Sequence, residues 1–235
     1  MKKVLMIALA LLITLLVGCT EKDSTLRNND EIKNNDIFLT DGEEPLNNEP
    51  NEYSAPSELG NDLTSFNVEI EGNLYRLPAP VSAFLDNGWE ITKKEVDTIA
   101  ANSNSSMSIT ITKNNKNCTV GLINYSDEVQ TVEACYVYNI NSKFYNILGE
   151  ALCDIDPVLP GGVTIGTSES EMKDIYKSLL EKETLYNSLR IREDAETEER
   201  RIYEYAAAGG ANYIQVYINR ETNLINNIVM KNDIR

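Results

Sequence analysis

Residues 163–180 read VTIGTSESEMKDIYKSLL and predict a short strand that leads into a helix. Ser168 and Glu171 have the spacing of a capping box, which closes the first turn of a helix. The apolar residues that follow recur at helical spacing on one face: Met172, Ile175, Tyr176, Leu179 and Leu180. The pattern therefore predicts a helix over 168–180 with one side in the core.

Strand patterns follow this helix, at 189–191, 200–206, 212–218 and 224–230. The preceding part of the chain has a similar order. Alternating strands at 66–71 and 74–77 are followed by a short helix from Val81. Further strands are predicted at 107–112, 118–122 and 132–140. The predicted fold class is therefore α+β, with two tandem repeats of a short helix packed on an antiparallel β-meander, over residues 63–148 and 149–235.

The segment from Val163 to Met172 resembles the pattern I-x-x-G-x-S-x-x-E-V of the β-lactamase-inhibitory-protein-like fold. Small bacterial lipoproteins of the outer-membrane assembly type share that fold. The similarity covers 160–235 well and 66–140 loosely. Helices of the family commonly end in Gly-x-Pro, whereas this one continues from Tyr176 to Leu180. The resemblance implies a protein-binding or assembly module that presents one face of a curved sheet.

Residues 1–19 form a predicted export signal. Lys2 and Lys3 precede an apolar run from Val4 to Val17, in which Thr14 is the only polar residue. The run is shorter than the stretch of about 20 apolar residues that spans a bilayer. With Cys19 at its end, it resembles a bacterial lipoprotein signal peptide, and an uncleaved anchor or plain secretion are the alternatives. The resemblance implies that the Cys19 thiol receives a diacylglycerol, that cleavage occurs before it, and that fatty acids such as palmitate hold the chain at the extracytoplasmic face of the cell membrane.

Residues 20–62 are predicted to be a disordered tether. The segment carries twelve acids and three bases, with scattered Asn pairs and prolines. Such a composition does not bury enough apolar surface to offset the entropy of ordering. A flexible chain of about 40 residues reaches roughly 35 Å, so it would hold the folded part away from the membrane.

The charge distribution and the residue types exclude several functions. Of the formal charge of −16, residues 1–19 contribute +2, and 20–62 and 63–235 contribute −9 each. Both mature parts repel phosphate backbones, so we expect no nucleic-acid partner. The chain has no histidine, which is the commonest general base and metal ligand. We expect no cofactor and no metal.

Cysteine usage leaves two alternatives open. If Cys19 is acylated, Cys118, Cys135 and Cys153 remain, without a C-x-x-C spacing. One disulfide with a free thiol and three reduced thiols both fit. A Cys118–Cys135 bridge requires a hairpin register that is less well patterned than its neighbour, in which Val120 faces Ala134.

Tyrosines mark a candidate binding surface. Alternation places Tyr213, Gln215 and Tyr217 on one face of the strand at 212–218, and Tyr203 and Tyr205 lie together on the neighbouring strand. Tyrosine provides a large contact area at low entropic cost. We therefore predict a non-enzymatic lipoprotein at the cell surface that binds a protein or glycan partner through a sheet face. The alternatives are an envelope enzyme, such as a carboxylate-based hydrolase, and a small-solute-binding lipoprotein. The S-x-x-K spacing of Ser170 and Lys173 is a weak signal for enzyme chemistry.

Overall fold

The computed structural model describes residues 53–103, 107–145, 148–149, 151–192, 199–208 and 210–234. The predicted signal peptide, Cys19 and most of the predicted tether lie outside these residues. Within them, no helix has the length and apolar character needed to cross a membrane. Residues 53–62, the end of the predicted tether, already contact the folded body, because the Asn67 side chain donates to the carbonyls of Glu58 and Leu59.

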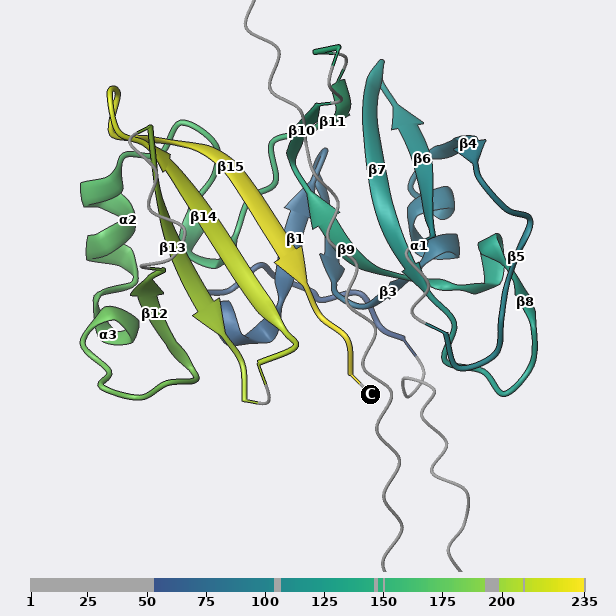
Figure 1. The fold of residues 1–235 in the computed structure, drawn as a ribbon, viewed down its shortest axis with the longest axis horizontal. Helices are drawn as coiled ribbons and strands as arrows, with labels where there is room; N and C mark the ends of the chain where they lie inside the picture. The colour runs from purple at the N-terminus through teal and green to yellow at the C-terminus, as the bar shows by residue number, and fades with distance from the viewer. Residues whose placement is uncertain are drawn as a thin grey trace, which may run out of the picture. The chain divides into compact units, whose positions relative to one another are not determined.

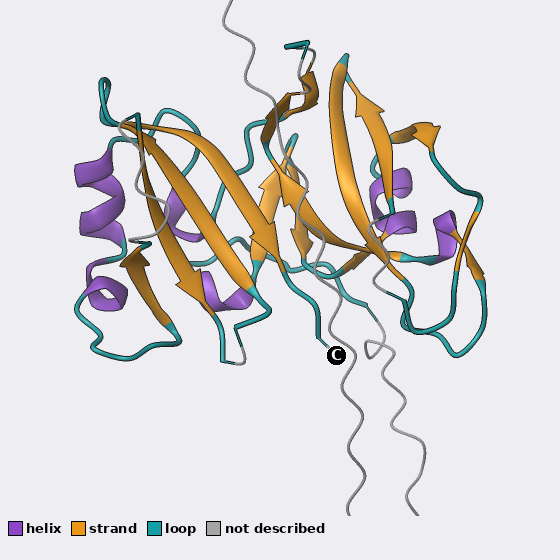
Figure 2. Ribbon diagram, in the orientation of Figure 1, coloured by secondary structure: helices purple, strands orange, loops and turns teal. Residues whose placement is uncertain are grey.

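One large antiparallel sheet organises the fold (Figures 1 and 2). Its long path runs, in spatial order, through β12 (Ser188–Ile191), β13 (Arg200–Ala206), β14 (Tyr213–Asn219), β15 (Leu224–Lys231), β9 (Tyr136–Asn141) and β7 (Lys116–Ile123). Beyond β7 the pairing continues to β6 (Ser108–Lys113) and β4 (Glu90–Lys94). The sheet is thus continuous through the β15–β9 pair, which joins strands far apart in the chain.

Short strands and helices complete the fold. Two of the strands form a separate hairpin, β1 (Asn67–Ile70) and β2 (Asn73–Arg76), and the other short strands are β3 (Ala79–Pro80), β5 (Thr98–Ile99), β8 (Gln130–Thr131), β10 (Lys143–Tyr145) and β11 (Ala151–Asp154). The α-helices are α1 (Val81–Asp86), α2 (Glu169–Ile175) and α3 (Lys177–Leu180), and single 3-10 turns occupy Leu63–Ser65, Val132–Ala134 and Pro160–Gly162. The predicted α+β class is confirmed, and all strand pairings between the described strands are antiparallel.

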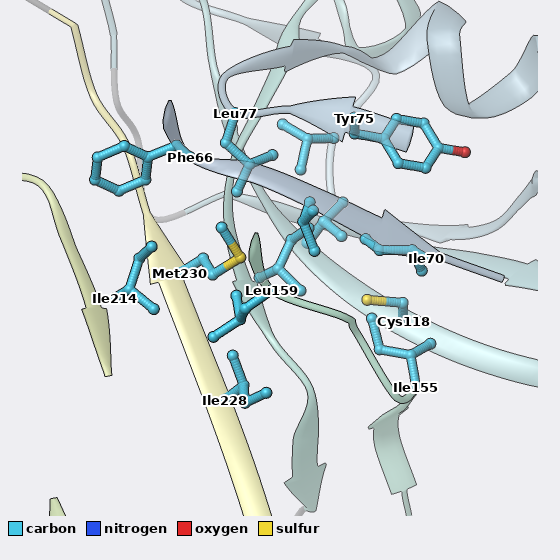
Figure 3. Close-up of a cluster of buried hydrophobic side chains, with 14 of the residues drawn as sticks. Phe66, Ile70, Tyr75, Leu77, Cys118, Ile155, Leu159, Ile214, Ile228 and Met230 are labelled. Atoms are coloured by element: carbon cyan, nitrogen blue, oxygen red, sulfur yellow. The ribbon is translucent and has the colours of Figure 1, made fainter. Parts of the chain in front are cut away.

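The core lies on one face of the sheet. Along β14, Ile214, Val216 and Ile218 point into it, as alternation predicts. Figure 3 shows Ile214, Ile228 and Met230 from the sheet facing Phe66 and Leu77 from the N-terminal hairpin region. This face is therefore the one covered by β1, β2 and the helices. The opposite face of the sheet points away from the core.

Trp89 is a core residue. Its side chain is 2% exposed and packs edge-on against Phe84 of α1, with 6.5 Å between ring centroids. Gly88, at φ 83°, follows the C-cap residue Asn87 of α1, and the Trp89 amide that comes next donates to the Phe84 carbonyl. The sole tryptophan is therefore packed in the core, and its ring is not available to stack on a ligand.

The predicted helix over 168–180 is interrupted, which corrects the sequence interpretation. Ser168 caps α2 by accepting a hydrogen bond from the Glu171 amide. At Tyr176 the backbone leaves helical geometry, and α3 begins at the next residue. The buried Tyr176 hydroxyl donates to the Pro160 carbonyl at 2.6 Å. The ring is thus held in the core at the break between the two helices, while Ile175 is 39% exposed.

The predicted strand at 163–166 is also absent. Val163 makes an isolated bridge to Leu159, across the turn at Pro160–Gly162. Gly161, Gly162 and Gly166 all have positive φ, which is incompatible with an extended strand. The chain therefore reaches α2 through turns.

The register between β7 and β9 differs from both registers considered from sequence. Val120 faces Ile140 and Ile123 faces Tyr136, with a bulge beside Gly121. The connection is longer than predicted because residues 132–134 form a 3-10 turn and not the start of the strand. A Cys118–Cys135 bridge is therefore wrong for this fold.

The sequence patterns did not predict several of the shorter strands, among them β4, β10 and β11. β4 lies in a stretch with weak alternation, and its burial pattern is almost wholly exposed. β10 and β11 pair with each other across the boundary predicted at residues 148 and 149. β4 and β11 also pair with strands that are more distant in the chain, β6 and β7, and local patterning does not encode such pairing.

Ser142 joins the two halves of the chain where β9 leaves β15. Its hydroxyl donates to Asn227 Oδ1 at 3.0 Å and accepts from the Ile228 amide at 2.9 Å. The side chain is fully buried.

We expect Ser142→Ala to lower the free energy of unfolding by about 1–2 kcal/mol, because a buried amide loses its acceptor. Urea denaturation measures this, with the exposed Ser178→Ala as the control, and an unchanged midpoint would contradict it.

Candidate functional site

The face of β12 to β15 that points away from the core carries a hydrogen-bonded row of polar side chains. Tyr217 donates to Gln215 Oε1 at 2.9 Å, and Gln215 Nε2 donates to Glu204 Oε2 at 2.5 Å. Arg192 Nη1 completes the row at 3.4 Å from the same carboxylate oxygen. We call the surface formed by Arg192, Glu204, Tyr213, Gln215 and Tyr217 the outer face.

Strand register builds this row. Glu204 lies directly opposite Gln215 in the β13–β14 ladder, and Ile202 lies opposite Tyr217. Because side chains alternate along a strand, Tyr213, Gln215 and Tyr217 share one side of β14. The two tyrosines are half-buried by their neighbours, while Gln215 is 5% exposed. These hydrogen bonds hold the side chains of the row in fixed positions.

The outer face is hollowed at the β12 end. An open cavity of about 720 Å³ is lined by Arg190, Ile191, Arg192, Glu204, Gly210, Tyr213 and Gln215. Its volume falls in the range of about 300–1,000 Å³ typical of ligand sites. Figure 1 shows no described helix in front of β14 and β15.

The outer face continues across β15. Lys231 lies opposite Tyr213 in the ladder, and its ammonium sits 5.9 Å from the centre of the Tyr138 ring. Tyr138, at the bulge of β9, packs with Ile123 and Tyr125 in a second, smaller apolar cluster. Aromatic and basic side chains thus extend from β14 to β9.

The tyrosine hydroxyls of the outer face are protonated at neutral pH. Burial raises the pKa of Tyr213, and Glu204 adds to this while Arg192 opposes it. Burial also raises the pKa of Tyr217. Both side chains therefore offer a neutral hydroxyl that donates or accepts a hydrogen bond.

Two predicted site residues lie elsewhere. Tyr203 and Tyr205 are each 1% exposed and point into the core, opposite Val216 and Ile214. They therefore do not contribute to the surface that Tyr213, Gln215 and Tyr217 form. Alternation along β13 puts Glu204, between them, on the outer face instead, so the same rule applied to β13 would have found Glu204 from sequence.

Tyr203 belongs to a charge cluster around the buried Glu169 carboxylate at the start of α2. Its hydroxyl donates to Glu169 Oε1 at 2.6 Å, and Lys173 Nζ and Arg201 Nη1 lie 2.7 and 2.8 Å from the same oxygen. Burial acts to raise the pKa of Glu169, but Lys173, Tyr203 and Arg201 outweigh it and lower the pKa to about 2. The carboxylate is therefore ionised at neutral pH.

The Ser170–Lys173 pair does not have the geometry of a nucleophile and its base. Ser170 Oγ lies 3.2 Å from Ser168 Oγ, while Lys173 is held by Glu169, which raises the pKa of the lysine. A lysine that accepts a proton from serine needs a lowered pKa. The S-x-x-K spacing here serves the structure of α2.

Asp154 and Asp156 are likewise held by lysines. Lys143 Nζ bonds Asp154 Oδ1 at 2.5 Å and Asp156 Oδ1 at 2.8 Å, and Lys116 lies 3.6 Å from Asp156. Burial acts to raise the pKa of Asp156, but Lys143 and Lys116 lower it overall. Asp156 is thus a poor proton donor, and the described residues contain no cluster of metal-ligating side chains.

The antiparallel sheet also bears on the solute-binding alternative. Solute-binding lipoproteins of transporters need two α/β lobes built from alternating strands and helices. The described strands pair only in antiparallel fashion, so they do not form such lobes.

Comparison with known proteins identified no relative. No protein-family model matches the sequence, and neither the curated proteins nor the solved structures give a match.

Proposed function

We propose that this chain is a lipid-anchored, non-enzymatic lipoprotein at the extracytoplasmic face of the cell membrane, and that its outer face binds a protein partner. The anchor part rests on the sequence of residues 1–19, which ends in Cys19. The acidic segment that follows is the tether, and anionic headgroups repel it. Attachment therefore depends on the acyl chains.

We further propose that the folded body consists of two tandem copies of one unit. In the first, α1 precedes β4, β6, β7 and β9; in the second, α2 and α3 precede β12, β13, β14 and β15. The last strands of the two units, β9 and β15, pair with each other. This order supports a β-lactamase-inhibitory-protein-like arrangement, in which the joined sheets offer one long face to a partner.

The observation that carries the binding proposal is the pre-formed row Tyr217–Gln215–Glu204–Arg192 beside an open cavity. Ordered side chains lose little entropy when a partner binds. Tyrosine and arginine are enriched in protein interfaces, especially where energy concentrates. A glycan stacked on Tyr213 is the alternative, and the same experiment distinguishes the two.

The test is capture of partners from envelope extracts by the full chain in detergent, with cross-linking and mass spectrometry. We expect Tyr213→Ala combined with Tyr217→Ala to weaken capture at least about 10-fold, since two interface anchors are lost. Tyr145→Ala, which removes an exposed tyrosine from β10, is the matched control.

The circular dichroism spectrum of the double variant must match that of the parent chain. Undiminished capture by the double variant would remove the outer face from consideration. Capture that persists after protease treatment of the extract and disappears after glycosidase treatment would replace the protein partner with a glycan.

A further inference from the structure

The two thiols of Cys118 and Cys153 meet inside the core. Cys118 on β7 lies directly opposite Cys153 on β11 in the antiparallel ladder. Their sulfur atoms are 2.8 Å apart, and the side chains are 1% and 0% exposed. Figure 3 shows Cys118 beside Ile70 and Ile155, in an apolar setting.

The ladder geometry suits a covalent bond between them. Residues directly opposite each other in antiparallel strands have Cα atoms about 4.5–5.5 Å apart. Disulfides need Cα separations of about 4.4–6.8 Å. Backbone pairing therefore presents the two side chains at bonding range, and no backbone movement is required.

Cys135 is excluded as a competitor. It precedes Tyr136, which lies opposite Ile123, five residues along β7 from Cys118. At about 3.3 Å per residue this places it roughly 16 Å away, well beyond disulfide range. Its thiol donates to the Thr131 carbonyl at 3.3 Å instead.

We propose that Cys118 and Cys153 form a disulfide in the exported protein and that Cys135 stays a thiol. The step is a thiol–disulfide exchange: each thiol loses a proton, a sulfur–sulfur bond forms between Cys118 and Cys153, and the two electrons reduce a small-molecule or protein disulfide to two thiols. The inference rests on the core geometry and on the proposed export of the chain, and it stands whether or not the outer face binds a partner.

The bond has a definite structural role. Cys118 and Cys153 are the sole residue pair in the β7–β11 ladder, supported by a hydrogen bond from Thr119 Oγ1 to the Leu152 carbonyl at 2.8 Å. A disulfide adds a covalent link to this pairing and fixes the β10–β11 hairpin to the long strand β7.

Burial determines when the bond forms. Desolvation raises the pKa of Cys118 well above its usual value, so little thiolate exists in the folded core. Exchange therefore takes place during folding or on transient opening, and the finished bond resists reductants in the folded protein.

The test refolds the reduced full chain from urea in mixtures of reduced and oxidised glutathione, followed by acid quenching, alkylation and peptide mass spectrometry. We expect one linked peptide pair, Cys118 with Cys153, with a loss of about 2 Da and an alkylated Cys135. The folded chain should retain the bond at a ratio of reduced to oxidised glutathione at least about 10-fold higher than the urea-unfolded chain, because folding raises the effective concentration of one thiol at the other.

Variants separate this pair from its competitor. Cys135→Ala should keep the linked pair, and Cys153→Ala should leave Cys118 alkylated. Reduction should lower the urea midpoint of the parent chain and leave that of Cys153→Ala unchanged. Alkylation of Cys118, Cys135 and Cys153 at every glutathione ratio, or a link that includes Cys135, would overturn the proposal.

Discussion

A Cys19→Ser variant is expected to carry no fatty acid and to keep residues 1–18. The predicted pathway acylates a thiol and cleaves only after acylation, so a hydroxyl at this position stops both steps. Each buried methylene of an acyl chain contributes about 0.8 kcal/mol to membrane binding, and stable attachment needs more than one chain. Loss of the thiol should therefore abolish the mature lipid-anchored form completely.

Labelling with a radioactive or alkyne-bearing fatty acid, together with the intact mass, measures this change. Cys135→Ser is the matched control, because it removes another cysteine, buried in the fold, and should leave labelling intact. If the parent chain retains residues 1–18 with an unmodified Cys19, the first 19 residues act as an uncleaved anchor. Labelling that persists in Cys19→Ser would place the lipid elsewhere.

Replacement of Glu169 by glutamine is expected to cause the largest loss of stability among the single changes proposed. The carboxylate accepts from Arg201, Tyr203 and Lys173, and its side chain is 9% exposed. Removing one member of a buried charge network costs about 3–5 kcal/mol. The side chains of Lys173 and Arg201 are 43% and 30% exposed, so water solvates their charges when the carboxylate is removed. We therefore expect Glu169→Gln to lower the free energy of unfolding by about 3 kcal/mol, at the lower end of that range.

Urea denaturation at neutral pH measures the loss, with Asp174→Asn as the control. That substitution removes the same charge from an exposed position of α2. A Glu169→Gln variant within about 0.5 kcal/mol of the control would show that the cluster contributes nothing beyond surface charge.

The same cluster predicts how acid acts. Glu169 has a pKa of about 2 in the folded chain, below its usual value of 4.5. The contribution of Glu169 to the free energy of unfolding is fully present above pH 4.5. It is lost as the pH falls towards 2, because the unfolded state binds the proton more readily than the folded state. The stability difference between the parent chain and Glu169→Gln should therefore shrink over that interval. A difference that stays constant from pH 6 to pH 2.5 would contradict this.

Local patterning predicted the elements that alternate strongly. β13, β14 and β15 begin and end within a residue of the expected positions, and Ser168 caps α2 as its spacing indicates. These elements carry their own signal, because burial of one face imposes a period of two on a strand and 3.6 on a helix. Alternation likewise placed Tyr213, Gln215 and Tyr217 together.

Pairing across long distances was not predictable in this way. β10 and β11 are short and weakly patterned, and they exist because β7 and each other supply their hydrogen bonds. Tyr203 and Tyr205 looked equivalent to the tyrosines of β14 until the register put them opposite Val216 and Ile214, on the core side.

The amino-acid order by itself determined the positions of the strands β13, β14 and β15, and it is the basis for predicting an export signal and an acidic tether, because each of these depends on residues that are close together in the chain. Only the tertiary structure decided which two thiols lie in contact, which tyrosines lie on the outer face and which three donors hydrogen-bond to Glu169. Those outcomes depend on strand register and on the packing of α2 against β13, which bring together side chains that are more than thirty residues apart.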